Sequence, residues 1–345
     1  MNRRKRKLSK PIVAVIITAA ISVVLIFSLL IINIFVPVRY LSAYFVKGEG
    51  NEEGVLKVSY VDADFGDCTL IELPDGKNVL IDGGDGAYPN TLRILRFLNS
   101  RGIGSIDYLI CTSVKGEHCG GLAEILKLKD VKYAYIPYCL NTRITDEYHS
   151  FYAALKDCGT SYGYACVGEG IYGDEYDYFL TFLSPSSYLS DRSEYGAMNS
   201  RPTEENIENA SAVIWLQYGE TAFAFTSDIR AEGLKGIVER YSASVELNQP
   251  FCEFNGRSVN LEKCKIVTAA GHAGKDNTYA PWYDLLKPEQ TIISVGKNFA
   301  DFPSLAALSD ICNYCEPLYT MYEGDITVTV SGGAYAVTTS KNKPD

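Results

Sequence analysis

Basic side chains are scarce in most of this chain. Residues 1–47 hold eight of the 32 Lys and Arg residues and none of the 42 Asp and Glu residues, so residues 48–345 carry 24 bases against 42 acids, a net charge of −18. No cluster of bases interrupts this acidic segment. Affinity for nucleic acid comes mainly from neutralising phosphates, and an acidic surface repels a polyanion. The composition therefore argues against nucleic acid as a partner of residues 48–345.

Charge is absent altogether from Pro11–Val36, a run of 26 mostly aliphatic residues. This exceeds the roughly 20 residues that cross a bilayer. A cleaved signal peptide has an apolar core of only about 7–15 residues, and a buried core helix would not carry so one-sided a charged flank. The flanking bases are Arg3, Arg4, Lys5, Arg6, Lys7 and Lys10 before the run, and Arg39 and Lys47 after it. Because the basic end of such a helix stays in the cytoplasm, we expect a single-pass protein of the cell membrane whose C-terminal domain is extracellular.

These features divide the chain into four predicted parts. Residues 1–10 are a basic cytoplasmic tail, 11–38 a transmembrane signal anchor, 39–54 a Gly- and Glu-containing linker, and 55–340 a globular domain. The ten cysteines leave two alternatives open. Their even number permits disulfides in an exported domain, whereas positions such as Cys111 in an apolar strand pattern favour small buried hydrophobes. Cys312-x-x-Cys315 has no second pair nearby, which makes zinc binding there a weak hypothesis.

Strand-like and helix-like segments alternate over the whole domain, a pattern typical of a layered α/β fold. We predict strands at residues 56–61, 68–73, 78–81, 107–111, 132–136, 178–183, 212–217, 221–225, 265–268, 291–295, 326–330 and 334–338. Helices are predicted at residues 91–100, 118–127, 145–156, 231–241, 282–286 and 304–312. The Tyr-rich stretch 159–208 has weak periodicity and predicts loops around one or two strands. Its sequence leaves open whether it is a lid, a binding surface or packing.

Polar residues gather where the predicted strands end, which is where enzymes built on sheets place catalytic groups. The clusters are Asp62–Asp67, Asp82–Asp85, Thr112–His118, Ser227–Asp228 and Gly271–Lys275. Two of the three histidines, His118 and His272, lie in them. The third, His149, falls in a predicted helix, and we assign it a surface or packing role.

The order and spacing of these clusters resemble the metallo-β-lactamase superfamily, most closely the soluble domain of ComEC-type competence proteins. The blocks that carry the resemblance are Val61-Asp62-Ala63-Asp64-Phe65-Gly66-Asp67, Leu80-Ile81-Asp82-Gly83-Gly84, Ile106-Asp107-Tyr108-Leu109, Gly120-Gly121, Asn209-Ala210-Ser211, Asp228 and Ile293-Ser294-Val295-Gly296-Lys297-Asn298. The resemblance covers about residues 55–340. It implies an αββα sandwich, which the predicted transmembrane helix precedes.

Departures from the family pattern fall mainly on its metal ligands. The family's loop H-x-H-x-D-H corresponds here to Ser113, Lys115, Glu117 and His118. The late Gly-His-His-Gly-Ser block becomes Gly271–Lys275, and Gly-His-Pro-Ser becomes Asp301–Ser304. The resemblance thus implies that one of two metal sites is dismantled, with Lys115 placed where that ion would lie.

The other metal site keeps four oxygen or nitrogen donors that suit zinc or manganese. The implied ligands are Glu117, His118, Asp228 and His272, and the implied cleft and structural residues are Asp62, Asp67, Asp82, Ser113 and Asn298. We therefore expect at most one divalent metal, with no bound metal as the alternative.

Three hypotheses of function follow from these residues. In the first, a one-metal hydrolase of phosphate esters or diesters uses Asp228 to orient water and Lys115 to stabilise an anionic transition state. In the second, a catalytically inactive domain keeps the fold and binds an unidentified ligand at the cell surface. The third is DNA uptake, which the family suggests and which the net charge and the single predicted membrane helix disfavour.

Overall fold

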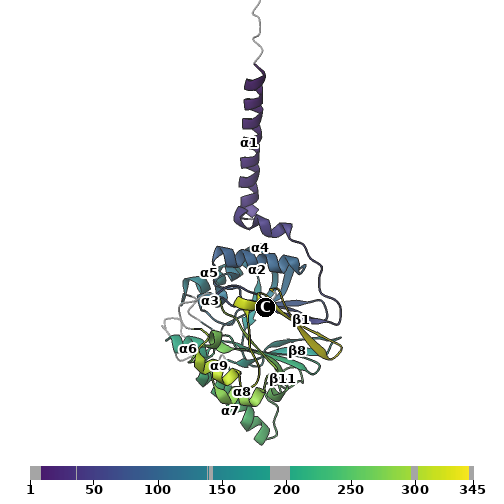
Figure 1. Cartoon of the computed structure of the whole chain (residues 1–345), viewed down its shortest axis with the longest axis vertical. Helices are drawn as coiled ribbons and strands as arrows, with labels where there is room; N and C mark the ends of the chain where they lie inside the picture. Colours follow the sequence, from purple (N-terminus) through teal and green to yellow (C-terminus); the bar gives the residue numbers. More distant parts are fainter. Residues whose placement is uncertain are drawn as a thin grey trace, which may run out of the picture. The chain divides into compact units, whose positions relative to one another are not determined.

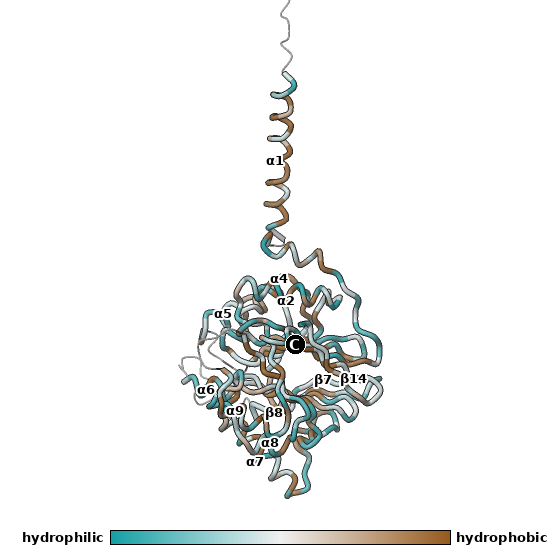
Figure 2. Tube along the Cα trace, viewed as in Figure 1, coloured by the Kyte–Doolittle hydropathy of each residue, from teal (hydrophilic) through white to brown (hydrophobic). Residues whose placement is uncertain are grey.

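The computed structural model describes residues 9–35, 37–137, 139, 143–186, 203–296 and 302–341. The chain divides into two compact units, Met1–Val46 and Lys47–Asp345. The first unit contains helix α1 (Lys10–Phe35) and the 3-10 helix η1 (Val38–Phe45). Within Lys10–Asn33, an 18-residue window has a mean hydropathy of 3.1, and hydrophobic residues follow one another along most of α1 (Figure 2). By length and composition α1 is a candidate membrane span, a property that it shares with signal sequences.

The second unit is built on two β-sheets (Figure 1). The first sheet has eight strands in the order β15-β14-β1-β2-β3-β4-β5-β6, and the second has seven in the order β13-β12-β11-β10-β9-β8-β7. In the first sheet the strands are β1 (Leu56–Tyr60), β2 (Thr69–Glu72), β3 (Asn78–Ile81), β4 (Ser105–Ile110), β5 (Asp130–Ile136), β6 (Ser161–Tyr164), β14 (Ile326–Ser331) and β15 (Ala334–Thr339). In the second they are β7 (Gly170–Tyr172), β8 (Tyr178–Ser184), β9 (Val213–Tyr218), β10 (Thr221–Phe225), β11 (Cys264–Thr268), β12 (Gln290–Ile293) and β13 (Leu318–Tyr319).

Helices cover the outer face of each sheet, which gives the four layers of the predicted αββα sandwich (Figure 1). Over the first sheet lie α2 (Tyr88–Ser100), α4 (Leu122–Leu128) and α5 (Asp146–Cys158), and over the second lie α7 (Ala231–Glu246), α8 (Ala280–Leu286) and α9 (Leu305–Ile311). The remaining helical segments are α3 (Gly116–Cys119), α6 (Glu204–Asn209), η2 (Leu261–Lys263), η3 (Ala270–Ala273) and α10 (Thr320–Glu323).

Strand β8 shows why these residues form a central layer. All seven of its residues are buried. Leu180 and Phe182 pack between the two sheets, whereas Phe179 and Leu183 pack toward α7 and α8, because successive side chains of a strand point to opposite faces. Burial of each large apolar side chain contributes about 1.5–3 kcal/mol. Such continuous apolar runs belong to sheets that are covered on both faces.

Parallel strands bring the ends of distant segments to one edge of the sandwich. Strands β3, β4, β5 and β6 are parallel neighbours, as are β10, β11, β12 and β13. A helix lies between successive strands of each set in the sequence, as parallel connections require. The loops that follow β4, β10 and β11 therefore leave the sheets at their carboxyl ends, where α/β folds place their sites.

The structure bears on two features of the sequence, the Tyr-rich stretch and the cysteines. The stretch 159–208 was expected to hold one or two strands, and that prediction is wrong, because its described part contains β6, β7 and β8 as well as α6. Despite the weak periodicity of the sequence, Tyr178 and Phe182 of β8 pack between the two sheets and Phe179 packs on the outer side of the second sheet. All ten cysteines are free in this structure, and six of them are buried.

Candidate metal centre

The loop that carries His118 is held against the β2–β3 region by its backbone. The N–H of Asp67 donates to the carbonyl of Glu117 (3.0 Å), and the N–H of Gly83 donates to the carbonyl of His118 (2.8 Å). A Cβ atom on Gly121 would lie 2.1 Å from the carbonyl oxygen of Gly83, which leaves space only for glycine there. The Gly-Gly pairs of the sequence motif therefore serve close packing of backbone on backbone.

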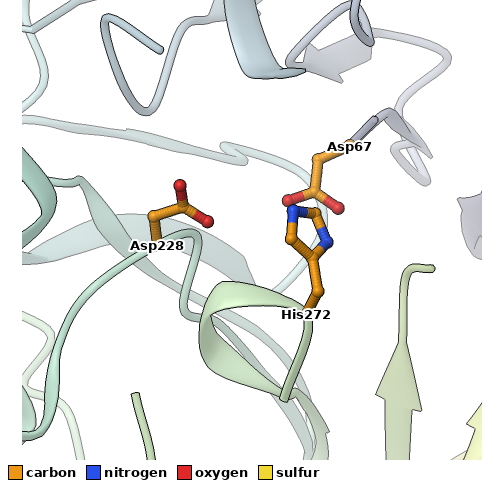
Figure 3. Close-up of side chains that lie close together, drawn as sticks. All are labelled: Asp67, Asp228 and His272. Carbon is orange, nitrogen blue, oxygen red and sulfur yellow. The ribbon is translucent and has the colours of Figure 1, made fainter. Parts of the chain in front are cut away.

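Asp67, Asp228 and His272 come together between the two sheets (Figure 3). One ligand atom from each residue lies within 4.8 Å of the others. The side chains of Asp228 and His272 are buried, with 1% and 4% of their surface exposed. Asp67 precedes β2, Asp228 follows β10, and His272 follows β11, so three separate segments build this group, which we call the open triad.

Two buried side chains of the open triad have polar atoms without a hydrogen-bond partner among the described residues. Nδ1 of His272 lies 2.7 Å from the carbonyl oxygen of Ser294 and donates to it, whereas Nε2 has no partner. Neither carboxylate oxygen of Asp228 accepts a hydrogen bond. Histidines that bind metals commonly donate their other N–H to a carbonyl group, which fixes the tautomer. Asp228 Oδ2 still has two cations as neighbours, Nζ of Lys115 at 2.8 Å and Nε2 of His118 at 3.1 Å. The unpartnered acceptor of this group is Nε2 of His272, and together with the carboxylates of Asp67 and Asp228 it fits a divalent cation.

The backbone around His272 is held in an uncommon conformation. Gly271, His272 and Ala273 all have positive φ angles, of 51°, 54° and 61°. Non-glycine residues in this left-handed region cost of order 1 kcal/mol or more, and such residues cluster at functional sites. The side-chain amide of Asn277 donates to the carbonyl of Asp228 (2.9 Å), so the turn after β11 is tied to the loop after β10.

A second group of ligand atoms shares Asp228 with the open triad. Atoms of Glu117, His118 and Asp228 also lie within 4.8 Å of one another. The ammonium of Lys115 lies beside this group, with Nζ 2.8 Å from Asp228 Oδ2, 2.9 Å from Glu117 Oε1 and 3.0 Å from Glu208 Oε1. An ammonium has three N–H donors, so each has a carboxylate nearby. We call this group the filled triad, because a cation of the chain already lies against it.

His118 lies between two carboxylates of the same region. Its Nδ1 is 2.9 Å from Asp82 Oδ2 and its Nε2 is 3.1 Å from Asp228 Oδ2. The second distance is that of an ion pair, although the atoms are not aligned for a hydrogen bond. Thr112 supports Asp82 through its N–H (2.8 Å) and its hydroxyl (2.5 Å).

These neighbours shift the pKa values of the buried groups in opposite directions. Burial lowers the pKa of His118, but the charges of Asp228 and Asp82 outweigh burial and raise this pKa well above its usual range. Burial likewise lowers the pKa of Lys115, and Asp228 and Glu117 raise it overall. Burial raises the pKa of Asp228, but His118 and Lys115 outweigh it and hold this pKa below its usual range. Asp228 is therefore ionised between two cations.

The predicted ligands are thus divided between two overlapping groups that share Asp228. Glu117 and His118 lie in the filled triad and His272 in the open triad, whereas the sequence treated all four as one set. Asp67, predicted only as a cleft residue, contributes a ligand atom to the open triad.

Other predicted residues have supporting positions or lie apart. Asp82 orients His118, and the hydroxyl of Ser113 accepts from the N–H of Lys115 at 3.4 Å. Asp62 lies apart and pairs with Arg93 (3.3 Å) and Lys341 (2.8 Å). Asn298 lies outside the described residues. His149 is exposed on α5, which favours the surface role over the packing role, the two alternatives predicted for it.

Sequence reasoning missed Glu208, which is buried on α6. Helix α6 begins with a capping box in which Thr203 and Asn206 satisfy each other's backbone N–H groups. Glu208 then reaches Lys115 with one oxygen (3.0 Å) and Arg230 with the other (2.9 Å). The only signal available in the sequence was Lys115 itself, because a buried ammonium requires carboxylate partners.

Comparisons with known proteins agree with this fold. The profile of the Metallo-beta-lactamase superfamily matches residues 61–160. ComE operon protein 3 of Bacillus subtilis (strain 168) is 23% identical over 257 residues, which cover 70% of this chain and 28% of that protein. The chain therefore spans only about a quarter of the length of this relative.

Two solved structures also match most of this chain, both with TM-scores below 0.5. The diiron β-hydroxylase CmlA from Streptomyces venezuelae matches with a TM-score of 0.43 and 14% identity, over 81% of this chain and 54% of that chain. A putative metal-dependent hydrolase from Parabacteroides distasonis matches with a TM-score of 0.38 and 10% identity, over 79% of this chain and 98% of that chain. The profile match, the relative and the two-sheet fold confirm the predicted resemblance of this chain to the metallo-β-lactamase superfamily and to ComE operon protein 3.

Proposed function

We propose that the domain is a one-metal hydrolase of phosphate esters or diesters, with zinc or manganese held by Asp67, Asp228 and His272. The observation that carries this proposal is the unpartnered Nε2 of buried His272, directed at two carboxylates while its Nδ1 is fixed by Ser294. Three protein ligands with an open position are the pattern of catalytic zinc sites. A divalent ion bound there would supply Lewis acidity and lower the pKa of water toward about 7.

The residues of the chain have separate tasks in this proposal. Asp228 is kept ionised by Lys115 and His118, so one of its oxygens can hold the ion while the other orients the attacking water. Lys115 takes the place of a second ion, because its positive charge lies between Glu117, Glu208 and Asp228. Its predicted contact with a transition-state oxygen remains a prediction, and it requires one of these three ion pairs to open.

Metal content tests this proposal directly. The full-length protein, purified in detergent without chelator, is expected to contain about one equivalent of zinc or manganese. His272→Ala should lose this metal and with it the turnover of bis(p-nitrophenyl) phosphate, since it removes one of three ligands. The matched control is His149→Ala, because His149 is exposed and outside both triads. A wild-type protein with almost no metal, not restored by added manganese or zinc, would overturn the one-metal hydrolase.

One observation favours the second candidate function, a catalytically inactive binding domain. The filled triad is neutralised by Lys115 and His118 without any metal, so half of the site needs no ion for its stability. The two functions differ in the metal assay, because an inactive domain would keep its fold and thermal stability after treatment with chelator and would show no turnover with any added ion.

We further propose that α1 anchors the domain in the membrane with residues 55–340 on the outer face. The length and hydropathy of Lys10–Asn33 and the bases before it support this placement. The protein should stay in the membrane pellet after alkaline carbonate extraction, and protease added to intact spheroplasts should digest the domain. Nucleic acid remains disfavoured as a partner by the net charge of residues 48–345, 24 bases against 42 acids.

A further inference from the structure

A small cavity between the two sheets adjoins the open triad, and its volume is about 30 Å³. The first sheet contributes Tyr60 of β1 and Ile81 of β3 to its walls, and the second contributes Phe225 of β10 and Thr268 of β11. Asp67, a member of the open triad, also lines it. A water molecule needs about 10–15 Å³ of accessible space. The cavity therefore has space for one or two water molecules beside a candidate metal ligand.

The hydroxyl of Tyr60 has no hydrogen-bond partner among the residues that the structure describes. Tyr60 is 2% exposed, and its side chain packs among the apolar residues between the sheets. Burial raises the pKa of Tyr60 well above its usual range and Cys264 raises it further, so the hydroxyl keeps its proton and can donate. A buried donor without a partner destabilises the fold, and buried water commonly supplies the partner.

Other polar groups of the cavity belong to a network that reaches the filled triad. Asp82, Thr112 and Ser227 all line the cavity. The hydroxyl of Thr112 donates to Asp82 (2.5 Å), and Asp82 in turn lies 2.9 Å from Nδ1 of His118. The hydroxyls of Thr112 and Ser227 are 2.7 Å apart. Because the only proton of the Thr112 hydroxyl goes to Asp82, Ser227 donates to Thr112 and its oxygen can still accept.

We propose that this cavity is the site of a buried water molecule that accepts a hydrogen bond from Tyr60 and donates to Asp67 and Ser227. Three hydrogen bonds are the number typical of a buried water. Tyr60 is then a positioning residue of the open triad, since it holds Asp67 through the water. The same water joins the open triad to the network that supports the filled triad. The inference rests on the proposed metal ion for its effect on metal affinity, and on the cavity alone for the water.

A double-mutant cycle on the full-length protein in detergent, with chelator present, tests the water site without any metal. Tyr60→Phe should lower the Tm by about 2–3 °C, because it removes the donor. In Asp67→Ala protein the same change should lower the Tm by less, since one bond of the water is already lost. If Tyr60→Phe leaves the Tm unchanged or raises it, the hydroxyl binds no water. Equal losses in both backgrounds would overturn the link to Asp67.

Tyr148→Phe is the matched control for both measurements. Tyr148 is a fully buried tyrosine of α5 that does not line the cavity, and its hydroxyl donates to the carbonyl of Pro137 (3.3 Å). The control should lower the Tm by the same amount in the wild type and in Asp67→Ala.

Manganese titration separates this inference from the proposed hydrolase. Tyr60→Phe should raise the Kd for manganese about tenfold, as loss of a group that supports a metal ligand commonly does, whereas Tyr148→Phe should leave it unchanged. An unchanged Kd in Tyr60→Phe would overturn its positioning role and keep the one-metal site. Non-additive Tm values in a protein that binds no manganese would support the water site and overturn the one-metal hydrolase.

Discussion

The open triad and the filled triad share Asp228, yet they satisfy their charges in different ways. In the filled triad the chain supplies its own cations, Lys115 and His118, within 3.1 Å of Asp228. In the open triad Nε2 of His272 has no partner among the described residues. The filled triad therefore has its counter-charges within the chain, whereas the open triad keeps an unpartnered buried nitrogen, which the proposed function assigns to a metal ion. Under that proposal, the two triads separate residues that serve stability from residues that serve binding.

The largest effect is expected from Asp228→Asn, which removes the residue common to both triads. Lys115 and His118 would lose a buried counter-charge, and breaking a buried ion pair commonly costs about 3–5 kcal/mol. Chemical denaturation should show a lower free energy of unfolding, and elemental analysis should show loss of metal. Asp177→Asn is the control, since the Asp177 side chain is 80% exposed, and it should change stability by less than about 0.5 kcal/mol. Similar stability of the two variants would contradict this account of Asp228.

A smaller effect is expected from Lys115→Met in protein freed of metal. The variant leaves the carboxylates of Glu117, Glu208 and Asp228 without their shared cation, which should lower the free energy of unfolding by about 2–4 kcal/mol. Added manganese should then raise the Tm of Lys115→Met more than that of the wild type, because the filled triad becomes available to an ion. If manganese raises both Tm values equally, the ammonium does not take the place of an ion.

The sharpest comparison uses two buried histidines, one in each triad. His118→Ala removes contacts with Asp82 and Asp228, whereas His272→Ala removes one hydrogen bond to Ser294 and the ring contacts with Phe65 and Phe302. In the presence of chelator, His118→Ala should be the less stable variant by about 1–2 kcal/mol. With metal present, the difference in the free energy of unfolding between the two variants should shrink or change sign, since only His272→Ala loses the ion. If the two variants lose equal free energy of unfolding, both with chelator and with metal, the two triads do not differ in the way proposed.

The sequence allowed the fold and much of the site to be predicted, because both depend on local patterns. Buried strands such as β8 can be predicted from their apolar runs. The order of the motifs placed His118, Asp228 and His272 at the ends of strands, and the topology brings these ends together. The division into two triads was not predictable in this way. It depends on the distances between the ammonium of Lys115 and three carboxylates, and spacing in the sequence does not specify these distances.

Glu208 and Asp67 illustrate the two reasons for failure. Glu208 follows Lys115 by 93 positions and reaches it only because α6 packs beside the site, and no motif marks it. Asp67 belonged to a recognised motif, but its type and position fit a turn as well as a ligand. Only its distance to Asp228 and His272 distinguishes the two roles.

The cation of the filled triad is bonded covalently to the chain, and this gives it a property that no bound ion has. Lys115 cannot dissociate, be removed by a chelator or be exchanged for a competing metal, whatever the ion supply around the protein. The carboxylates around Lys115 therefore keep their counter-charge in metal-poor surroundings, and Asp228 keeps its contact with that ammonium. A covalently attached cation lacks the chemical versatility of a metal ion, but the cleft that it stabilises persists when metal is scarce.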